Sequence, residues 1–239
     1  MTLLITGGHG TLGRALAEIF PDARRPMRSE IDVTDERSMR AYLSAHPPTE
    51  VIHAAALTDV VRCEEDRDLA WRVNVEGTDA LLRASREVSP DCQFLYVSTA
   101  GVFRGDTGDY SEASRPDPVN YYGLTKLVGE ERVRCHPRTC VVRTNFVSGG
   151  TWPHPSAFVD RFGTYLYTTG AAKGIRDVFA ARLTGTVHVC SGDRLSLYDL
   201  ARRTDPAVTP ITMDAYQGPP LTRDMSLITQ RWRTYTLDD

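Results

Sequence analysis

Short apolar segments alternate with amphipathic segments through the first two thirds of the chain. Four apolar runs have the length and composition of strands: TLLIT (2–6), VIHAA (51–55), CQFLYVS (92–98) and CVVRT (140–144). Segments with helical periodicity lie between them, for example residues 11–20 and 73–88. Short apolar strands separated by helices are typical of a parallel sheet with helices on both faces. The pattern therefore predicts an α/β fold, a doubly wound parallel sheet of the Rossmann type.

The alternation weakens in two places. PDARRPMRSEI (21–31) is short and polar for a strand, so it is only a weak candidate for a second one. After the fourth apolar run the pattern loosens, and SGGTWPHP (148–155) is a Gly/Pro-rich break. A last strand–turn–helix unit follows at 185–203. We expect a dinucleotide-binding domain over residues 1–147 and a small, partly interleaved substrate-binding lobe over residues 148–239.

Composition narrows the range of partners. The 239 residues are 41% hydrophobic and 25% charged with a formal net charge of -3, which gives no reason to expect nucleic acid or an anionic membrane as partner. The five cysteines include no CxxC pair, so we expect no metal site, and the odd count suits a reducing cytosol. No apolar run reaches the roughly 20 residues of a membrane span. The chain opens on a strand pattern and not on a signal peptide, so we expect a cytoplasmic protein.

A glycine-rich loop follows the first predicted strand. LLITGGHGTLGRAL places Gly7, Gly10 and Gly13 between a strand and a helix. This order suits a tight turn, a close approach of backbone to a pyrophosphate, and close packing of helix on strand. The phosphates would meet the helix N-terminus, where free N–H groups favour anions. We therefore predict a dinucleotide site that also includes the loop residues His9, Thr11 and Leu12; the alternative is a glycine-rich turn without a ligand.

The choice between NAD and NADP depends on the residues after the first helix. Asp32 lies about 20 residues past the glycines, where an acid that binds the ribose would indicate NAD. Arg24, Arg25 and Arg28 cluster just before it, and arginine is suited to the 2′-phosphate of NADP. We favour NADP, with Arg28 as a contact, and keep NAD open; the alternative is that these arginines are only solvated.

Tyr122 and Lys126 lie four residues apart in NYYGLTKLVGE (120–130), on one face of any helix that contains them. A phenol titrates near 10 and is a poor acid at neutral pH, but a nearby ammonium group lowers its pKa. FLYVSTAGVF places Ser98 and Thr99 at the end of a predicted parallel strand, where such sheets bind ligands. These residues form a candidate catalytic group; the alternative for the tyrosine–lysine pair is an ordinary surface helix.

The segments TGGHGTLG, HAAALTDV, NVEGT, VSTAGVF and YYGLTK occur in an order and approximate spacing that resembles the extended short-chain dehydrogenase/reductases. The resemblance is nearest to the dTDP-4-dehydrorhamnose reductase group. It covers residues 1 to about 147 and resumes around GTVHVCSGDRLSLYDLA and PLTRDMSL. It implies that Thr99 is the catalytic hydroxyl, with Ser98 as its substitute, that Tyr122 is the general acid and that Lys126 assists it.

The same resemblance assigns further residues. Asn74 resembles an asparagine that supports a proton-relay water, and its alternative is simple helix-to-loop hydrogen bonding. Asp32 and Val33 match an adenine-contacting pair, which weakens the interpretation of Asp32 as a ribose-binding acid. The residues that match the strand-end segment lining the cofactor are Ala54, Ala55, Ala56 and Thr58.

The sequence also departs from this group. Ala100-Gly101 replaces the acidic–aromatic pair that usually follows the catalytic threonine, which would reshape the space beside the reacting carbon. The lobe is abbreviated between Asn145 and Gly185. WPHP (152–155) is a candidate cap for a pocket, with His154 as a loop histidine. Four cations are candidates for holding a nucleotide diphosphate, or alternatively solvated charges: Arg143, Arg161, Lys173 and Arg176.

The expected function is NADP-dependent reduction of a ketone on a polar small molecule, above all a keto-sugar attached to a nucleotide. Two alternatives stay open: an epimerase or dehydratase that retains its dinucleotide, and a non-catalytic NADP-binding subunit resembling the β subunit of methionine adenosyltransferase. The helix that carries Tyr122 and the NVEGT helix resemble subunit-pairing elements of this superfamily, so a homodimer is a further candidate.

Overall fold

The computed structural model describes residues 2–237. Its centre is a five-stranded sheet with the order β1-β2-β3-β4-β9, in which every neighbouring pair is parallel. The strands are β1 (Leu3–Thr6), β2 (Glu50–His53), β3 (Gln93–Thr99), β4 (Thr139–Thr144) and β9 (Gly185–Val189). Four of the five correspond to the apolar runs of the sequence, and the fifth belongs to the strand–turn–helix unit.

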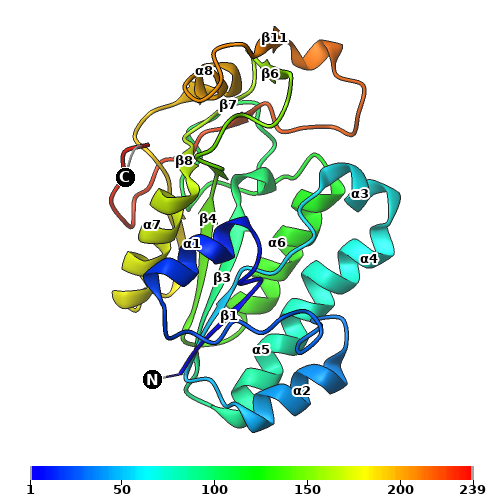
Figure 1. Ribbon diagram of the computed structural model, residues 1–239, viewed down its shortest axis with the longest axis vertical. Helices are drawn as coiled ribbons and strands as arrows, with labels where there is room; N and C mark the ends of the chain where they lie inside the picture. The colour runs from blue at the N-terminus through cyan, green and yellow to red at the C-terminus, as the bar shows by residue number, and fades with distance from the viewer. Residues whose placement is uncertain (1, 238–239) are drawn as a thin grey trace.

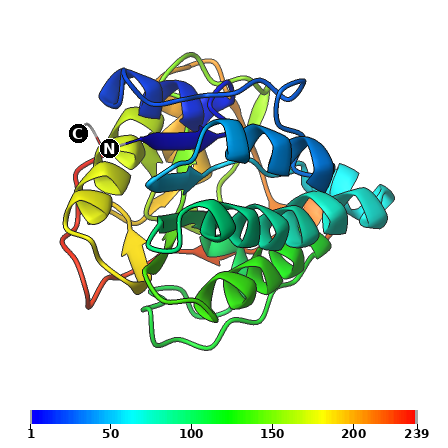
Figure 2. The same ribbon diagram turned by 90° about the horizontal axis from the view of Figure 1, so that it is seen from below.

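Helices cover both faces of this sheet (Figures 1 and 2). One face is covered by α1 (Thr11–Ile19) and α7 (Thr168–Ala180). The other is covered by α2 (Glu36–Ala45), α5 (Gly77–Val88) and α6 (Tyr121–Arg134). Alternate strand residues serve the two layers, since Ile5 and Leu95 pack toward α1 and α7 whereas Leu4 and Phe94 pack toward α2 and α5. The predicted doubly wound α/β fold is confirmed.

Smaller elements connect the second strand to the third. Two short helices, α3 (Val60–Glu65) and α4 (Arg67–Trp71), lead into a π-helical turn, η1 (Arg72–Glu76), which continues directly into α5. The predicted helix over 73–88 is therefore real, but its first turn is wider than an α-helix. A 3-10 turn, η2 (Ala100–Val102), follows β3 at the carboxyl edge of the sheet.

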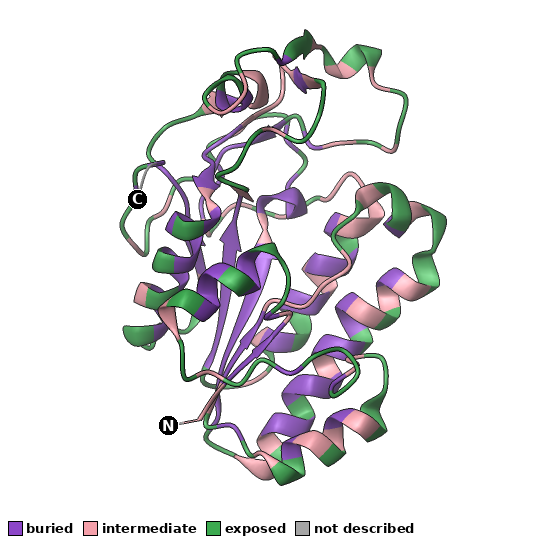
Figure 3. Ribbon diagram, viewed as in Figure 1, coloured by how far each residue is buried: buried purple, intermediate pink, exposed green. Residues whose placement is uncertain are grey.

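A lobe of short strands lies over this carboxyl edge (Figure 1). It contains a three-stranded sheet of β10 (Leu195–Ser196), β7 (Phe162–Gly163) and β12 (Asp224–Met225). Two two-stranded sheets accompany it, β11 (Thr209–Ile211) with β6 (Ser156–Phe158) and β5 (Phe146–Val147) with β8 (Leu166–Tyr167). The lobe is completed by α8 (Leu197–Arg202) and the 3-10 turn η3 (Met213–Ala215). The core strands are almost wholly buried, whereas the lobe mixes buried and exposed residues (Figure 3).

The backbone passes several times between the lobe and the main sheet. Helix α7 and strand β9 follow residue 148 in sequence, yet they complete the main sheet and its cover. The division at residues 147 and 148 into two domains remains a prediction about folding units.

The weak strand expected within residues 21–31 does not form. Arg24 makes a single parallel bridge to Leu4, through Arg24 N–H to Leu3 O at 2.8 Å and Ile5 N–H to Arg24 O at 2.9 Å. Pro21 and Pro26 lie on either side of Arg24, and proline lacks the N–H that a strand needs for its ladder. The segment therefore touches the sheet at one point only.

Candidate active site

A cavity of about 830 Å³ lies between the carboxyl edge of the sheet and the lobe. Ligands of open α/β sheets bind at this edge, and the volume is within the usual range for small-molecule sites. Its wall combines the glycine loop, the end of β3, the start of α6 and the lobe. The predicted residues that line it are Gly7, Gly10, Thr11, Leu12, Gly13, Ala54, Ala56, Thr58, Ser98, Thr99, Tyr122 and Lys126.

The glycines of the loop have different duties. Gly7 has φ +69°, and a side-chain Cβ there would lie 2.7 Å from Ala55 N. A Cβ on Gly13 would overlap the Gly7 carbonyl oxygen, so that position lets α1 pack on the turn. A Cβ on Gly10 would meet only Gly7 O, at 3.3 Å, and Gly10 caps α1 without a side-chain hydrogen bond. The first N–H groups of α1 are thus open toward the cavity, which fits the phosphates of a dinucleotide.

Helix α6 holds Tyr122 and Lys126 at the cavity. Its start is capped twice, because Gly123 N–H donates to Asn120 Oδ1 at 2.9 Å and Tyr121 N–H donates to Glu64 Oε1 at 2.7 Å. A Cβ on Gly123 would overlap the Gly101 carbonyl oxygen. The helix therefore lies directly against the turn η2, which brings its tyrosine beside the end of β3.

The structure distinguishes between the two hydroxyls at the end of β3. Ser98 is buried and donates its hydroxyl to Glu130 Oε1 at 2.6 Å. Thr99 accepts from Gly101 N–H at 3.0 Å, and its hydroxyl interacts with Tyr122. Because the Ser98 hydroxyl is bonded to Glu130, Thr99 is the hydroxyl available next to the phenol of Tyr122.

The ionisation of Tyr122 and Lys126 differs from the expectation. Burial raises the pKa of the Tyr122 phenol, the nearby Cys63 raises it further, and the hydrogen bond with Thr99 opposes the shift. Burial lowers the pKa of Lys126 to about 7, against the attraction of Glu130. The Nζ atom of Lys126 lies 3.9 Å from the centroid of the Tyr96 ring. The expected lowering of the tyrosine pKa by the lysine is therefore wrong for this arrangement, because burial dominates.

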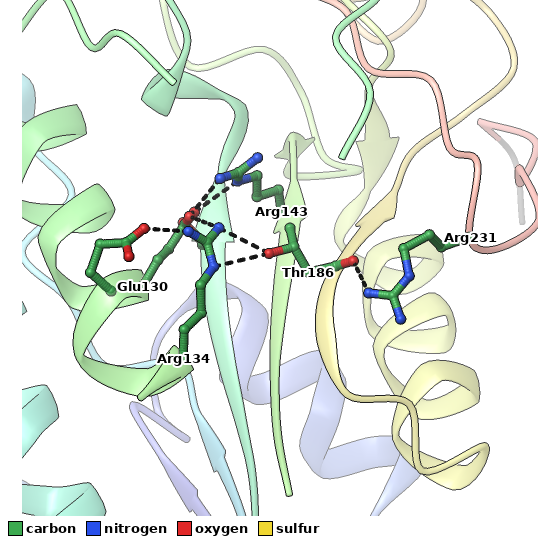
Figure 4. Close-up of polar contacts among 7 residues, drawn as sticks. Glu130, Arg134, Arg143, Thr186 and Arg231 are labelled. Carbon is green, nitrogen blue, oxygen red and sulfur yellow. Dashed lines mark hydrogen bonds and ion pairs between the residues drawn. The ribbon is translucent and has the colours of Figure 1, made fainter. Parts of the chain in front are cut away.

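A network of ion pairs and hydrogen bonds surrounds the buried carboxylate of Glu130, which is also on α6 (Figure 4). Glu130, one helical turn after Lys126, accepts from Arg143 Nε at 2.9 Å and Arg143 Nη2 at 2.7 Å. Arg134 Nη2 donates to the same carboxylate at 2.9 Å and also to Thr186 Oγ1 at 2.9 Å. With the bond from Ser98, the network joins α6 to β3, β4 and β9.

This network corrects one expectation for Arg143. Its side chain is 1% exposed, so it is neither a solvated charge nor a holder of a nucleotide diphosphate. The interpretation failed because its partner, Glu130, was not recognised. The available signal was an acid four residues after Lys126, on the same helical face.

Several predicted residues lie outside the lining of the cavity. Arg28 forms an exposed ion pair with Asp32 at 3.0 Å, and Thr34 also donates to Asp32. His9 Nε2 lies 3.1 Å from Arg25 O. Val33 packs against the core on the α2 side. Contacts of these residues with an adenosine remain predictions.

Asn74 is buried and its amide is fully engaged. Leu57 N–H donates to its Oδ1 at 2.8 Å, and its Nδ2 donates to Leu57 O at 2.9 Å and to Thr125 Oγ1 at 3.0 Å. This is the helix-to-loop hydrogen bonding that was the alternative to a water-relay role. Ala55, also outside the lining, supplies the backbone against which Gly7 turns.

The lobe contributes the other wall of the cavity. Trp152 and His154 line it, so the WPHP segment borders a pocket as expected. Of the remaining cation candidates, Arg161 lines the cavity, whereas Lys173 and Arg176 do not. Arg176 instead pairs with Asp177 at 2.8 Å.

Comparison with known proteins places the chain among its relatives. The sequence pattern of the RmlD substrate binding domain matches residues 1–219. The chain belongs to this family. The predicted resemblance to the dTDP-4-dehydrorhamnose reductase group is thereby confirmed. Within residues 2–237 no helix is long and apolar enough to cross a membrane.

Two curated proteins illustrate how similar the chain is to known sequences. The chain is 29% identical over 246 aligned residues to a dTDP-4-keto-6-deoxy-D-glucose reductase from Streptomyces niveus, covering 90% of this chain and 84% of that protein. It is 33% identical over 141 residues to the methionine adenosyltransferase 2 subunit beta of Xenopus laevis, covering 54% of this chain and 42% of that protein.

Solved structures of the family superpose over nearly the whole chain. A dTDP-4-dehydrorhamnose reductase from Clostridium acetobutylicum has a TM-score of 0.87 at 28% identity, covering 95% of this chain and 90% of that one. The Bacillus anthracis reductase, solved in complex with NADP, has a TM-score of 0.86 at 25% identity, with 95% and 91% covered.

Proposed function

We propose that this protein is an NADPH-dependent reductase of a nucleotide-linked 4-keto-sugar. The observation that carries the proposal is that Thr99, Tyr122 and Lys126 border the same cavity as the glycine loop. The names of the relatives supply the substrate class, and the NADP complex of one relative supports the cofactor. The open N-terminus of α1 and the bare face of Gly10 fit the dinucleotide phosphates.

In this proposal NADPH supplies the hydride for the carbonyl carbon, and side chains of the protein polarise and protonate the carbonyl oxygen. Thr99 donates a hydrogen bond that polarises the carbonyl, and Tyr122 gives it a proton. The raised pKa of Tyr122 keeps the phenol protonated until that moment, which suits a donor better than a base. Lys126, in its ammonium form, stabilises the phenolate that is left.

Tyr122→Phe tests the proposal. The substitution removes the proton donor and keeps the ring, so NADPH oxidation with dTDP-4-keto-6-deoxyglucose should be lost while NADP still binds. The measurement is the decrease of NADPH absorbance, with cofactor binding followed separately by fluorescence. Undiminished turnover in the Phe variant would remove Tyr122 from the mechanism.

A non-catalytic, NADP-binding subunit is the second candidate, because the methionine adenosyltransferase subunit shares 33% identity with this chain over 141 residues. An epimerase or dehydratase that returns its hydride is the third. Stoichiometry separates the three: a reductase consumes one NADPH for each product, an epimerase consumes none, and a subunit copurifies with an enzyme and turns over no ketone. We also retain a homodimer as a proposal, which light scattering in solution tests.

A further inference from the structure

The wall of the cavity carries positive charge without compensating acids. Among its lining residues in the described part of the chain, Lys126 and Arg161 are the only lysine or arginine, and none is an aspartate or glutamate. Lys126 lies at the reaction centre on α6, and Arg161 comes from the lobe, immediately before β7. The cavity is therefore suited to a ligand with negative charge on the side of the lobe.

Arg161 is held in place without an ionic partner. Its Nε donates to Thr222 O at 3.1 Å, and its Nη2 lies 3.6 Å from Met225 Sδ. Within residues 2–237 no carboxylate forms an ion pair with it. The adjacent acid, Asp160, is already bound by Arg223 Nη1 at 2.6 Å and by Met213 N–H at 2.8 Å.

The contrast with Arg143 shows what is missing at Arg161. Arg143 is buried and has a bidentate bond to Glu130. Burial lowers the pKa of Arg161, and only tyrosine hydroxyls, those of Tyr165 and Tyr216, act against it. Arg161 is half-buried, and a cation that is partly removed from water without an anion beside it raises the free energy of the protein, which a bound anion would lower.

Aromatic side chains lie on the same side of the cavity. Phe158 and Tyr216 form an edge-to-face pair with their ring centroids 5.7 Å apart, and both line the cavity. Trp152 also lines it and is fixed by its Nε1–H, which donates to Ser156 O at 3.2 Å. Fixed aromatic faces beside a guanidinium suit a planar base joined to phosphate.

We propose that Arg161 binds the diphosphate of a nucleoside diphosphate and so places the attached sugar at Tyr122. The inference deepens the proposed function and rests on it for the identity of the sugar. Arg161 is then a residue that determines substrate specificity, and it acts in binding and not in the chemical step. Of the four cations that the sequence offered for this duty, only Arg161 faces the cavity.

The test is the binding of dTDP and of thymidine to protein saturated with NADP, measured by titration calorimetry. Saturation keeps dTDP away from the dinucleotide phosphates. Arg161→Gln should weaken dTDP binding by about 10- to 100-fold, because it removes a charged donor, and should leave thymidine binding unchanged. Arg202→Gln is the matched control, since Arg202 is exposed on α8 and outside the cavity lining. Arg161→Lys keeps the charge and should retain part of the dTDP affinity.

Three results would overturn the inference: equal dTDP affinity in the wild type and Arg161→Gln, a wild type that binds dTDP no more tightly than thymidine, or a loss of NADP affinity in the variant. If the Gln variant does not fold, as judged by its melting temperature, the same comparison is made with Arg161→Lys, for which unchanged dTDP affinity contradicts the inference. The titration needs no turnover, so its outcome is separate from that of Tyr122→Phe. If the protein has no reductase activity but binds dTDP through Arg161, the proposed function is refuted and the inference about Arg161 stands.

Discussion

Replacement of Glu130 by glutamine measures how much the ionic network around this residue contributes to the free energy of unfolding. The side chains of Glu130 and Arg143 are 0% and 1% exposed, and the carboxylate accepts hydrogen bonds from Arg143, Ser98 and Arg134. Glutamine has nearly the same shape, but its NH₂ group would face the donors of a guanidinium. Arg143 Nη1 already has no hydrogen-bond partner among the described residues, so the variant leaves a buried cation without any anion. Breaking such a pair from one side costs about 3–5 kcal/mol.

The neighbouring residue provides a matched control. Glu131 is on the same helix, pairs with Arg134 and has a side chain that is 60% exposed. Glu131→Gln should therefore cost no more than about 1 kcal/mol. Urea unfolding followed by circular dichroism measures both free energies of unfolding. At this chain length each kcal/mol lowers the melting temperature by about 2–4 °C, so Glu130→Gln should lower it by about 6–20 °C.

A double variant completes the test. Glu130→Gln with Arg143→Met removes both charges, and stability should recover in part relative to Glu130→Gln alone. If Glu130→Gln and Glu131→Gln differ by less than about 1 kcal/mol in their free energies of unfolding, the reasoning about the buried pair is refuted.

Two further predictions follow from the site. Since burial lowers the pKa of Lys126 to about 7, its ammonium form is present below that pH and lost above it. The value of kcat/KM for NADPH-dependent reduction should therefore fall as pH rises through about 7. A flat pH profile up to pH 9 would contradict this role of the lysine. Gly10→Ala should lower the melting temperature only slightly, since its Cβ would lie 3.3 Å from Gly7 O, but should bind NADPH more weakly. Gly13→Ala should lower the melting temperature much more, because its Cβ overlaps Gly7 O. Thermal unfolding and NADPH fluorescence distinguish these effects, and equal behaviour of the two variants would contradict the assigned duties.

The sequence predicted the parts of the molecule that depend on local patterns. Apolar runs bounded by polar segments identified β1 to β4, and the order of motifs brought Thr99, Tyr122 and Lys126 into one cavity. The structure of the segment around Arg24 was harder to predict, since the prolines beside it limit its pairing with the sheet to one β-bridge.

What escaped prediction depends on contacts between distant elements. Arg143 lies in an otherwise apolar strand, and nothing in its own neighbourhood indicates that an acid of α6 neutralises it. Likewise, the direction of the Tyr122 pKa shift is set by burial, and burial depends on which elements pack around the phenol in the folded chain. The choice of Arg161 over Lys173 and Arg176 required knowing which cations face the cavity.

The repeated passage of the chain between lobe and sheet has a mechanical consequence. The backbone passes between lobe and sheet after β4, before α7, after β9 and after β12, so four connections restrain the lobe relative to the sheet. The separation between an anchor before β7 and the phenol at the start of α6 is then nearly fixed. If Arg161 binds the diphosphate as proposed, the site would select substrates by length, because a nucleotide with one phosphate fewer would hold its carbonyl short of Tyr122.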